Sequence, residues 1–411
     1  MSQASRIARR TFLAGSAVAA AASGLPRTVD AQTGAALPAR PTEQGAPLRP
    51  YGTPSPFERD VVRVAADGPP TAISSWDFTP LQHLEGIVTP SGLVFERNHG
   101  GVPQIDPARH RLLVHGLVDN PRVFTLDDLR RLPSVSVMRF LECSGNSLSE
   151  WKKPTGATVQ ITHGLVSCCE WTGVRVSAVL AELGLKPGAK WVLAEGADAA
   201  LMDRSVPLEK MMDDALLVWS QNGEALRPEQ GYPLRLLLPG FEGNMNVKWL
   251  RRLKVASEPF YTREETAKYT DLLGNGEARM FTFAMEAKSV ITRPSGGMHL
   301  GRRGSYEISG LAWSGRGKIV RVEVSSDAGA SWNAASLQEP VLTKCLTRFR
   351  YPWTWNGGEA VLQSRCVDET GYVQPTLADL VRVRGLNSFY HLNAIQSWHV
   401  ASGGEVTNIH A

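Results

Sequence analysis

The chain has 411 residues and a nearly balanced charge, with 44 Lys and Arg against 40 Asp and Glu. This length is enough for two or three compact units with a sizeable core. A net charge of +4 gives no support for a nucleic-acid-binding protein, which would need basic residues gathered on one face. The 38 Gly and 26 Pro favour many turns and a loop-rich, largely β architecture.

The first 31 residues have the pattern of a twin-arginine signal peptide. Arg9 and Arg10 precede a mildly apolar run, and Val29 and Ala31 are the small residues that signal peptidase needs before its cleavage site. The run is too short and too rich in Ala and Gly to span a bilayer stably, so an N-terminal anchor helix is the weaker alternative. No later stretch has the length of a transmembrane helix. We therefore expect no membrane span, and export of the folded chain to the periplasm, a route commonly used by proteins that already carry a cofactor.

Composition and pattern divide the rest of the chain into an arm and two domains. Residues 32–84 are rich in Pro, Gly, Ala and Thr, and we interpret them as an extended arm that wraps a neighbour or stays partly mobile. Residues 85–258 mix strand and helix patterns and are predicted to form one α+β domain. A linker is expected over 259–285, followed by an all-β domain over 286–411.

Turn and capping signals place the elements of the α+β domain. Thr125 is a suitable N-cap, Gly184 is a suitable helix end, and Asn222-Gly223 is a favoured hairpin dipeptide. The predicted helices are 125–132 and 174–183, and the predicted strands are 111–118, 135–141, 191–194, 216–220, 232–238 and 247–255.

The C-terminal segment has short strands separated by turns. Val320, Val322 and Val324 alternate with charged residues, and a turn at 327–329 precedes a predicted strand at 361–367. Strands of this length and spacing favour a β-sandwich of immunoglobulin type.

The spacing of the five cysteines argues against several cofactors. The sequence has no Cys-x-x-Cys-His motif for c-type haem and no Cys-x-x-Cys pair for zinc or an iron–sulfur cluster. Cys168 and Cys169 are adjacent, a spacing that rarely forms a disulfide, and we expect them to be buried structural residues. An odd number of cysteines leaves at least one without an intrachain partner.

Cys143 is different because of what surrounds it. A lone cysteine after a strand is more often an inert buried residue than a functional one. Here Ser144-Gly145-Asn146 follows directly, which is turn chemistry that would lift the sulfur out of the strand end into a loop. Loops on a rigid sheet are where functional sites are commonly built.

Three segments, in the right order, resemble the signature segments of sulfite oxidases, which are molybdenum oxidoreductases. They are Phe95–Gly100, Leu141–Asn146, and a stretch from Gly231-Tyr-Pro-Leu-Arg235 to Val247-Lys-Trp-Leu-Arg-Arg252. The resemblance runs from about residue 85 to the C-terminus. It implies an α+β fold with a molybdopterin-binding domain of sulfite oxidase type, followed by an all-β, immunoglobulin-like dimerisation domain.

The resemblance also implies a molybdenum–pyranopterin cofactor and the residues that hold it. Cys143 is the implied thiolate ligand of molybdenum, in keeping with the preference of soft thiolates for redox metals. Arg235 and Lys248 would hold the pterin phosphate, whereas the alternative for both is a solvated strand face. The implied catalytic residues are Cys143, Arg97, Tyr269 and His391, and the implied cofactor-binding residues are Phe95, Asn98, His99, Cys143, Gln230, Arg235 and Lys248.

The chain departs from sulfite oxidases where those enzymes bind the sulfite dianion. Leu148 stands where the family has an arginine five residues after the cysteine, His391 stands where it has another before Trp398, and Gln230 replaces a family histidine. Each lost contact to a charged group would cost about 1.5–3 kcal/mol. The combination resembles the molybdenum subunit of sulfane dehydrogenases of the periplasmic thiosulfate-oxidising system. That resemblance implies oxidation of a sulfane sulfur, bound to a cysteine of a carrier protein, to the sulfonate level.

The remaining expectations concern partners and alternatives. Because the chain has no haem, flavin or nicotinamide motif, we expect its electrons to pass to a c-type cytochrome. The resemblance implies that this cytochrome is a tightly bound subunit and that the β domain forms a homodimer, giving a heterotetramer. His391 is interpreted as a proton acceptor or weak cation near the metal, or else as a packed histidine, and Tyr269 as an active-site tyrosine or else as a linker aromatic. The alternative functions are a sulfite:cytochrome c oxidoreductase, a sulfoxide reductase, whose relatives usually lack the β domain, and a non-catalytic binding module.

Overall fold

The computed structural model describes residue 45, residues 47–65 and residues 74–411. The predicted signal peptide and the start of the arm lie outside the described residues. The account below concerns one compact unit, residues 55–411. Among the described residues, no helix has the length and apolar character needed to cross a bilayer.

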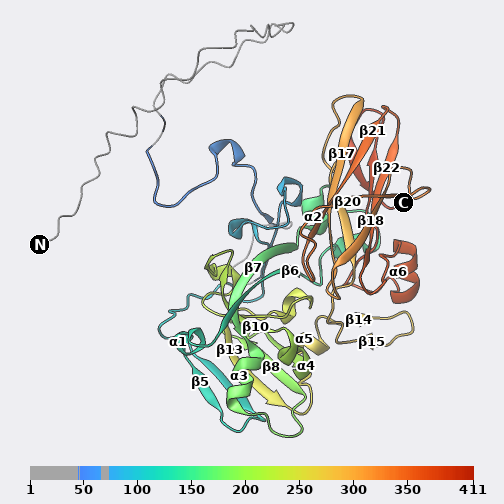
Figure 1. Cartoon of the computed structure of the whole chain (residues 1–411). Helices are drawn as coiled ribbons and strands as arrows, with labels where there is room; N and C mark the ends of the chain where they lie inside the picture. Colours follow the sequence, from blue (N-terminus) through green and yellow to red (C-terminus); the bar gives the residue numbers. More distant parts are fainter. Residues whose placement is uncertain (1–44, 46, 66–73) are drawn as a thin grey trace, which may run out of the picture. The chain divides into compact units, whose positions relative to one another are not determined.

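The first part of this unit contains two five-stranded sheets and one three-stranded sheet (Figure 1). One five-stranded sheet has the order β11-β10-β7-β6, with β12 also paired to β10, and the other has the order β5-β4-β13-β8-β9. The strands are β1 (Val64–Ala65), β2 (Ser75–Phe78), β3 (Glu96–Asn98), β4 (Leu112–Gly116), β5 (Arg122–Phe124), β6 (Ser134–Glu142), β7 (Val166–Arg175), β8 (Trp191–Gly196), β9 (Asp203–Pro207), β10 (Leu216–Gln221), β11 (Glu224–Ala225), β12 (Arg235–Leu237) and β13 (Leu250–Ala256). The helices are α1 (Leu126–Arg130), α2 (Val159–His163), α3 (Val176–Leu183), α4 (Leu208–Asp213) and α5 (Arg263–Thr266).

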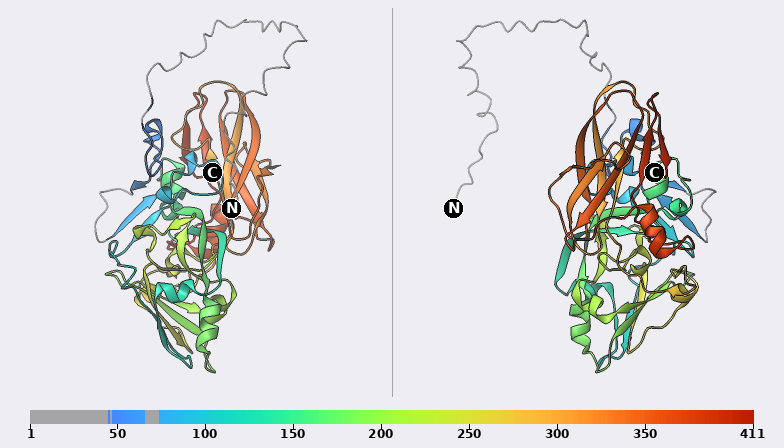
Figure 2. Two further views of the ribbon diagram at one scale, coloured as in Figure 1. Left: turned by 60° about the vertical axis from the view of Figure 1, so that its left-hand side comes forward. Right: turned by 90° about the vertical axis from the view of Figure 1, so that its right-hand side faces the viewer.

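The second part, orange to red in Figures 1 and 2, is built mainly from a four-stranded and a five-stranded sheet. The orders are β16-β17-β21-β20 and β19-β18-β22-β23-β24, and a small β14–β15 hairpin precedes them. The strands are β14 (Asp271–Leu272), β15 (Ala278–Arg279), β16 (Lys288–Arg293), β17 (Gly304–Trp313), β18 (Ile319–Ser325), β19 (Asn333–Ala334), β20 (Ser336–Leu337), β21 (Thr347–Trp355), β22 (Ala360–Asp368), β23 (Ser397–Val400) and β24 (Val406–Ile409), with one helix, α6 (Leu377–Arg384).

Most predicted elements of the α+β part are confirmed, with shifted ends. Thr125 caps α1, as the sequence predicted, and the structure adds a capping box with Asp128. The helix predicted from residue 174 begins at Val176, because Val174 is still paired with Ser134 in the sheet. The strand β7 was not predicted, and neither was α6, a helix within the segment expected to be all-β.

The two parts share a hydrophobic core. One cluster of buried side chains combines Leu81 and Leu84 of the arm and Phe140 of β6 with residues of both C-terminal sheets, such as Trp313 and Trp398. The arm also supplies β2, which pairs with β3. Burial across this junction fixes the end of β6 against the C-terminal sheets, and Cys143 directly follows that strand.

Candidate active site

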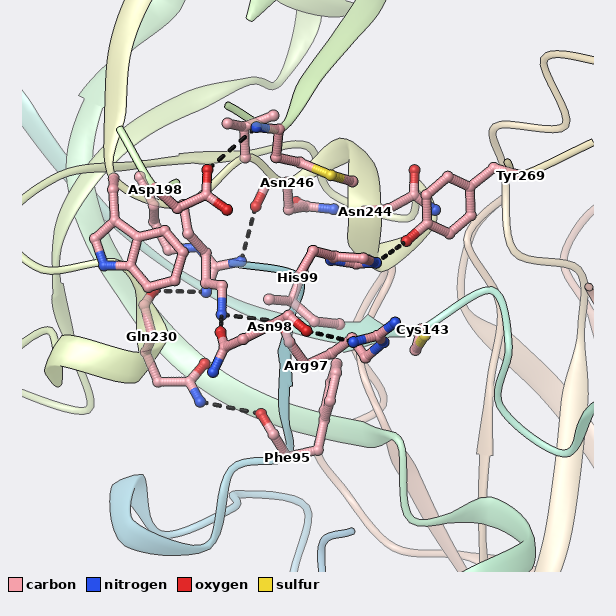
Figure 3. Close-up of a pocket in the computed structure, with 17 residues that line it drawn as sticks. Phe95, Arg97, Asn98, His99, Cys143, Asp198, Gln230, Asn244, Asn246 and Tyr269 are labelled. Carbon is pink, nitrogen blue, oxygen red and sulfur yellow. Dashed lines mark hydrogen bonds between the residues drawn. The ribbon is translucent and has the colours of Figure 1, made fainter. Parts of the chain in front are cut away.

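A cavity of about 680 Å³, mouth included, lies at the end of β6 (Figure 3). Nine of the residues proposed from the sequence line it: Phe95, Arg97, Asn98, His99, Cys143, Gln230, Arg235, Lys248 and Tyr269. Segments far apart in the chain therefore meet at one pocket, as the resemblance to sulfite oxidases implied.

A tight turn after β6 presents the Cys143 thiol to the cavity. The Cys143 amide donates to Leu165 O at 2.9 Å, and the Asn146 amide donates to Cys143 O at 2.9 Å. Gly243 allows the opposite wall to approach, because a Cβ there would lie 2.9 Å from Glu142 O and 3.2 Å from Cys143 Cα. The thiol is held by backbone bonds on one side and by close packing on the other.

The electrostatic setting of Cys143 suits a metal ligand more than a free nucleophile. Burial raises the pKa of the Cys143 thiol, and Arg97 only partly counteracts this. The polypeptide alone therefore favours the neutral thiol. A bound metal ion would supply the positive charge that makes the thiolate stable.

The strand β3 contributes a row of pocket residues that is braced by the arm. Arg97 lies opposite Trp76 of β2, with its guanidinium 5.0 Å from the indole ring, and donates to Ser75 O at 3.3 Å. Asn98 is 2% exposed and accepts a hydrogen bond from Lys248 Nζ. The arm thus fixes the orientation of an arginine that faces the Cys143 side of the cavity (Figure 3).

His99 and Tyr269 form a hydrogen-bonded pair on the same side of the cavity. Tyr269 Oη and His99 Nε2 are 2.9 Å apart. Burial, with Arg97 and Lys248 nearby, lowers the pKa of His99 to about 3, and burial raises the pKa of Tyr269 well above its usual value. Both side chains are therefore neutral at neutral pH, and one proton is shared in the bond between them.

Arg235 and Lys248 are two buried cations that form no ion pair with a carboxylate within the part of the chain that the structure describes. Arg235 donates to Gln230 O at 2.9 Å and to Asn246 O at 3.1 Å, while its Nε has no hydrogen-bond partner. Lys248 Nζ donates to Arg97 O at 3.1 Å and to Glu229 O at 2.8 Å. Burial lowers the pKa of Arg235 to about 10, and burial together with Arg235 lowers that of Lys248 to about 7.

Such an arrangement is unfavourable without an anion. Two positive charges in a buried site cost free energy unless a negative group neutralises them. Gly231, with φ +106°, lets the chain turn tightly here, since a Cβ would lie 3.1 Å from both Arg235 Cβ and Lys248 Cβ. The donor set and the unsatisfied Arg235 Nε fit a phosphate group, which accepts several charge-assisted hydrogen bonds at once.

Two of the sequence-proposed residues have structural contacts that explain their place. Gln230 Nε2 donates to Phe95 O at 3.0 Å, so this side chain ties β3 to the turn before β12. His391 does not line the cavity. Its amide donates to Ser144 O at 2.8 Å and its Nε2 lies 3.1 Å from Glu242 Oε2, so it stands behind the loop that carries Cys143.

The sequence did not single out several other residues of the cavity. Asp198, Met202, Asn244, Asn246 and Trp249 line it as well. Three of them lie inside or directly before the third signature segment, and Asp198 follows the end of β8, a position where polar residues often serve a site. Behind the wall, Arg204 pairs with Glu242 at 3.2 Å, and its guanidinium lies 5.3 Å from the Tyr269 ring.

Comparison with known proteins identifies two families of molybdopterin oxidoreductase domains that this chain matches. Residues 99–263 match the family described as "Oxidoreductase molybdopterin binding domain", and residues 279–398 match "Mo-co oxidoreductase dimerisation domain". Mitochondrial sulfite oxidase of Mus musculus is 32% identical over 346 residues, which cover 77% of this chain and 61% of that protein. NADH nitrate reductase of Ulva prolifera is 30% identical over 350 residues, covering 75% of this chain and 40% of that protein.

A solved structure is similar over nearly its whole length. The crystal structure of the sulfane dehydrogenase SoxCD from Paracoccus pantotrophus superposes with a TM-score of 0.88 at 48% identity, covering 90% of this chain and 96% of that chain. The chain spans about 61% of the sulfite oxidase that it matches. The predicted fold class, a molybdopterin-binding domain followed by a β-rich dimerisation domain, is confirmed. The chain belongs to the sulfite oxidase family of molybdopterin oxidoreductases.

Proposed function

We propose that this chain is a molybdenum-dependent oxidoreductase that oxidises a sulfane sulfur, carried on a cysteine of a carrier protein, to the sulfonate level. The observation that carries the proposal is a single cavity with the Cys143 thiol in one wall and the buried Arg235–Lys248 cation pair in another. The sulfane substrate is supported by the charges at the Cys143 side and by the likeness to a sulfane dehydrogenase. The alternative is a sulfite:cytochrome c oxidoreductase with the same cofactor and fold.

Different residues of the cavity would hold different parts of the cofactor. Cys143 would ligate molybdenum, and Arg235 and Lys248 would hold the pterin phosphate. The pterin itself would contact the residues that connect these two ends: Phe95, Asn98, His99 and Gln230. When bound, the molybdenum–pyranopterin would supply two-electron redox chemistry.

The charge distribution favours a substrate with less negative charge than free sulfite. Of the three lining cations, two would be neutralised by the phosphate, which leaves Arg97 to face the sulfur substrate. Leu148, 37% exposed, contributes no charge, and His391 is already hydrogen-bonded to Glu242. A dianion needs several fixed donors at its site, whereas one arginine is sufficient for a monoanionic sulfur group.

The neutral Tyr269–His99 pair can hold a proton next to the reacting sulfur. The Tyr269 hydroxyl lies in the cavity wall and can donate to an oxygen that sulfur acquires. His99, neutral because burial lowers its pKa to about 3, can serve as the hydrogen-bond partner of Tyr269 Oη when that hydroxyl is not turned to the substrate. Arg204, stacked on the Tyr269 ring, keeps this side chain in place.

The proposal includes partners and location. Electrons would leave to a c-type cytochrome subunit, and residues 286–411 would form a homodimer, which the match of residues 279–398 to a dimerisation domain supports. Arg9, Arg10 and the following apolar run support export through the twin-arginine pathway to the periplasm.

The substrate can be tested without an electron acceptor. Purified chain of known molybdenum content is mixed with excess sulfite, or with a carrier protein that bears a cysteine persulfide, and the thiolate-to-molybdenum absorption band is followed. We expect the persulfide to bleach the band and sulfite to leave it unchanged. Prompt bleaching by sulfite would replace the sulfane assignment by the sulfite alternative. If the purified protein contains no pterin under conditions that load a known family member with its cofactor, the molybdenum proposal is refuted.

A further inference from the structure

The residue before Cys143 is held by a donor pair from the C-terminal sheets. Glu142 is fully buried and accepts from Lys288 Nζ at 3.1 Å and from Trp313 Nε1 at 2.6 Å. Lys288 and Trp313 lie directly opposite each other in the pairing of β16 with β17. One rung of the C-terminal sheet therefore presents both donors to one carboxylate, each carboxylate oxygen receiving one of them.

The same lysine reaches the turn that carries the thiol. Lys288 Nζ lies 3.0 Å from Ser147 Oγ and 3.4 Å from Asn146 O. Asn146 in turn donates from Nδ2 to Glu142 Oε1 at 2.9 Å and accepts the Leu165 amide on its Oδ1 at 3.1 Å. The ammonium group is thus bonded on both sides of Cys143, to the residue before it and to residues after it.

This geometry is more specific than stability alone requires. A buried ion pair is weak evidence for a stabilising role, because desolvation offsets much of the attraction. Glu142 and Lys288 are 0% and 1% exposed, and their contacts converge on residues 142–147, the segment that contains Cys143. What such a network provides is a fixed orientation of the atoms between its anchor points.

We propose that Lys288 and Trp313 are positioning residues for Cys143, so that the C-terminal domain forms part of the metal site in addition to its part in dimerisation. The proposal rests on the assignment of Cys143 as the molybdenum ligand under the proposed function. It predicts that removing the Lys288 ammonium changes the geometry of the thiolate at the metal without removing any residue that lines the cavity.

The test compares Lys288→Met with a matched control, Arg348→Met. Arg348 is also a cation in the C-terminal sheets, 1% exposed, but it donates to Leu84 O at 2.7 Å and to Gly86 O at 2.9 Å and has no contact with the Cys143 turn. In the molybdenum-loaded proteins, we expect Lys288→Met to shift the thiolate-to-molybdenum absorption band and the electron paramagnetic resonance spectrum of the one-electron-reduced metal. Arg348→Met should lower the melting temperature and leave both spectra unchanged.

A second readout does not need the cofactor. In cofactor-free protein, iodoacetamide alkylation of Cys143 is followed by peptide mass spectrometry, and we expect Lys288→Met to raise its rate about tenfold as the turn opens more often. The double variant Glu142→Gln with Lys288→Met removes both charges, so it tests the idea if the uncompensated carboxylate of the single variant prevents folding. Trp313→Phe, which removes only one donor, should give a smaller change of the same kind.

The outcomes separate this inference from the proposed function. Spectra and alkylation rates equal to those of the wild type in Lys288→Met and in the double variant would overturn the positioning role, even if both variants melt at lower temperature. Absence of molybdenum from the wild-type protein would overturn the proposed function, while the alkylation rates would still decide whether Lys288 orders the Cys143 turn.

Discussion

The two ends of the cavity differ in the charged groups that they present to a ligand. At one end, Arg235 and Lys248 are buried cations that form no ion pair with a carboxylate within the described residues, so this end is suited to a strongly charged anion. At the other end, Cys143 lies near a single lining arginine, Arg97. Behind that end, His391 and Arg204 are both hydrogen-bonded to the buried Glu242 and add little net charge.

This difference explains how one pocket can bind a phosphate tightly and still accept a weakly charged sulfur group. Positive charge is concentrated at the end that would hold the permanently bound phosphate. It is lower at the Cys143 end, where the substrate must bind and the product must leave. Glu242 has its pKa lowered, since Arg204 and His391 outweigh the effect of burial, so it remains an anion and cancels positive charge near the reacting end. The predictions below test each end separately.

The largest effect is expected from loss of the thiol at the reacting end. Cys143→Ser should abolish the thiolate-to-molybdenum band and reduce activity by more than the roughly 10–100-fold typical of changes behind a metal ligand. The matched control is Cys169→Ser, because Cys169 is a buried cysteine of the same hydrophobic cluster but accepts from Gln221 at 3.3 Å instead of lining the cavity. Retention of the band in Cys143→Ser would show that another group binds the metal.

At the phosphate end, Arg235→Met should weaken cofactor binding without altering the metal's spectrum in the fraction that is loaded. Loss of charge-assisted bonds of about 1.5–3 kcal/mol corresponds to roughly 10- to 100-fold in affinity. Pterin fluorescence after oxidation and molybdenum analysis give the occupancy. Arg348→Met, a buried arginine outside the cavity, is the control, and equal loss of cofactor in both variants would argue against a phosphate contact.

The elements predicted correctly from the sequence are those whose signal lies in neighbouring residues. The strand β6 was predicted because its residues alternate, and the turn after it was predicted because Ser144-Gly145-Asn146 favours one. The strand β7 was missed because it is central in its sheet and buried along most of its length, so it shows no alternation. Its ten residues, with two cysteines among them, resemble a core segment of any kind.

The contacts that fix the site could not be predicted, because they join residues far apart in the chain. Lys288 and Glu142 are far apart in the chain, and neither neighbourhood indicates the other, yet they form a buried ion pair. His391 was inferred from its spacing to a tryptophan, while its partner Glu242 and the stacked Arg204 had no signal of their own. Long-range pairing arises from the shared core and could not be read from composition or periodicity.

Introducing a cation at the Cys143 end should shift the substrate preference partly toward sulfite. Leu148→Arg places a guanidinium on the Cys143 turn at a side chain that is 37% exposed, so the change needs little rearrangement. A new contact to sulfite of about 1.5–3 kcal/mol predicts a roughly 10- to 100-fold gain in kcat/KM for sulfite. Leu148→Gln, of similar length without charge, should give no such gain, and equal effects of the two variants would contradict the electrostatic explanation.

A pH dependence of anion binding is expected at the phosphate end. The pKa of Lys248 is lowered to about 7 by burial and by Arg235, although Glu96, Asp198 and Glu229 act in the opposite direction. In the cofactor-free chain the lysine therefore loses its proton as the pH rises through about 7, and affinity for an anion should fall by up to about tenfold per pH unit above that value. Sulfate is the suitable probe, because its own charge is constant over this range, and its binding can be measured by calorimetry between pH 6 and pH 9. Lys248→Arg, which stays protonated, should bind sulfate with a flat profile, whereas an equally steep profile in that variant would place the titrating group elsewhere.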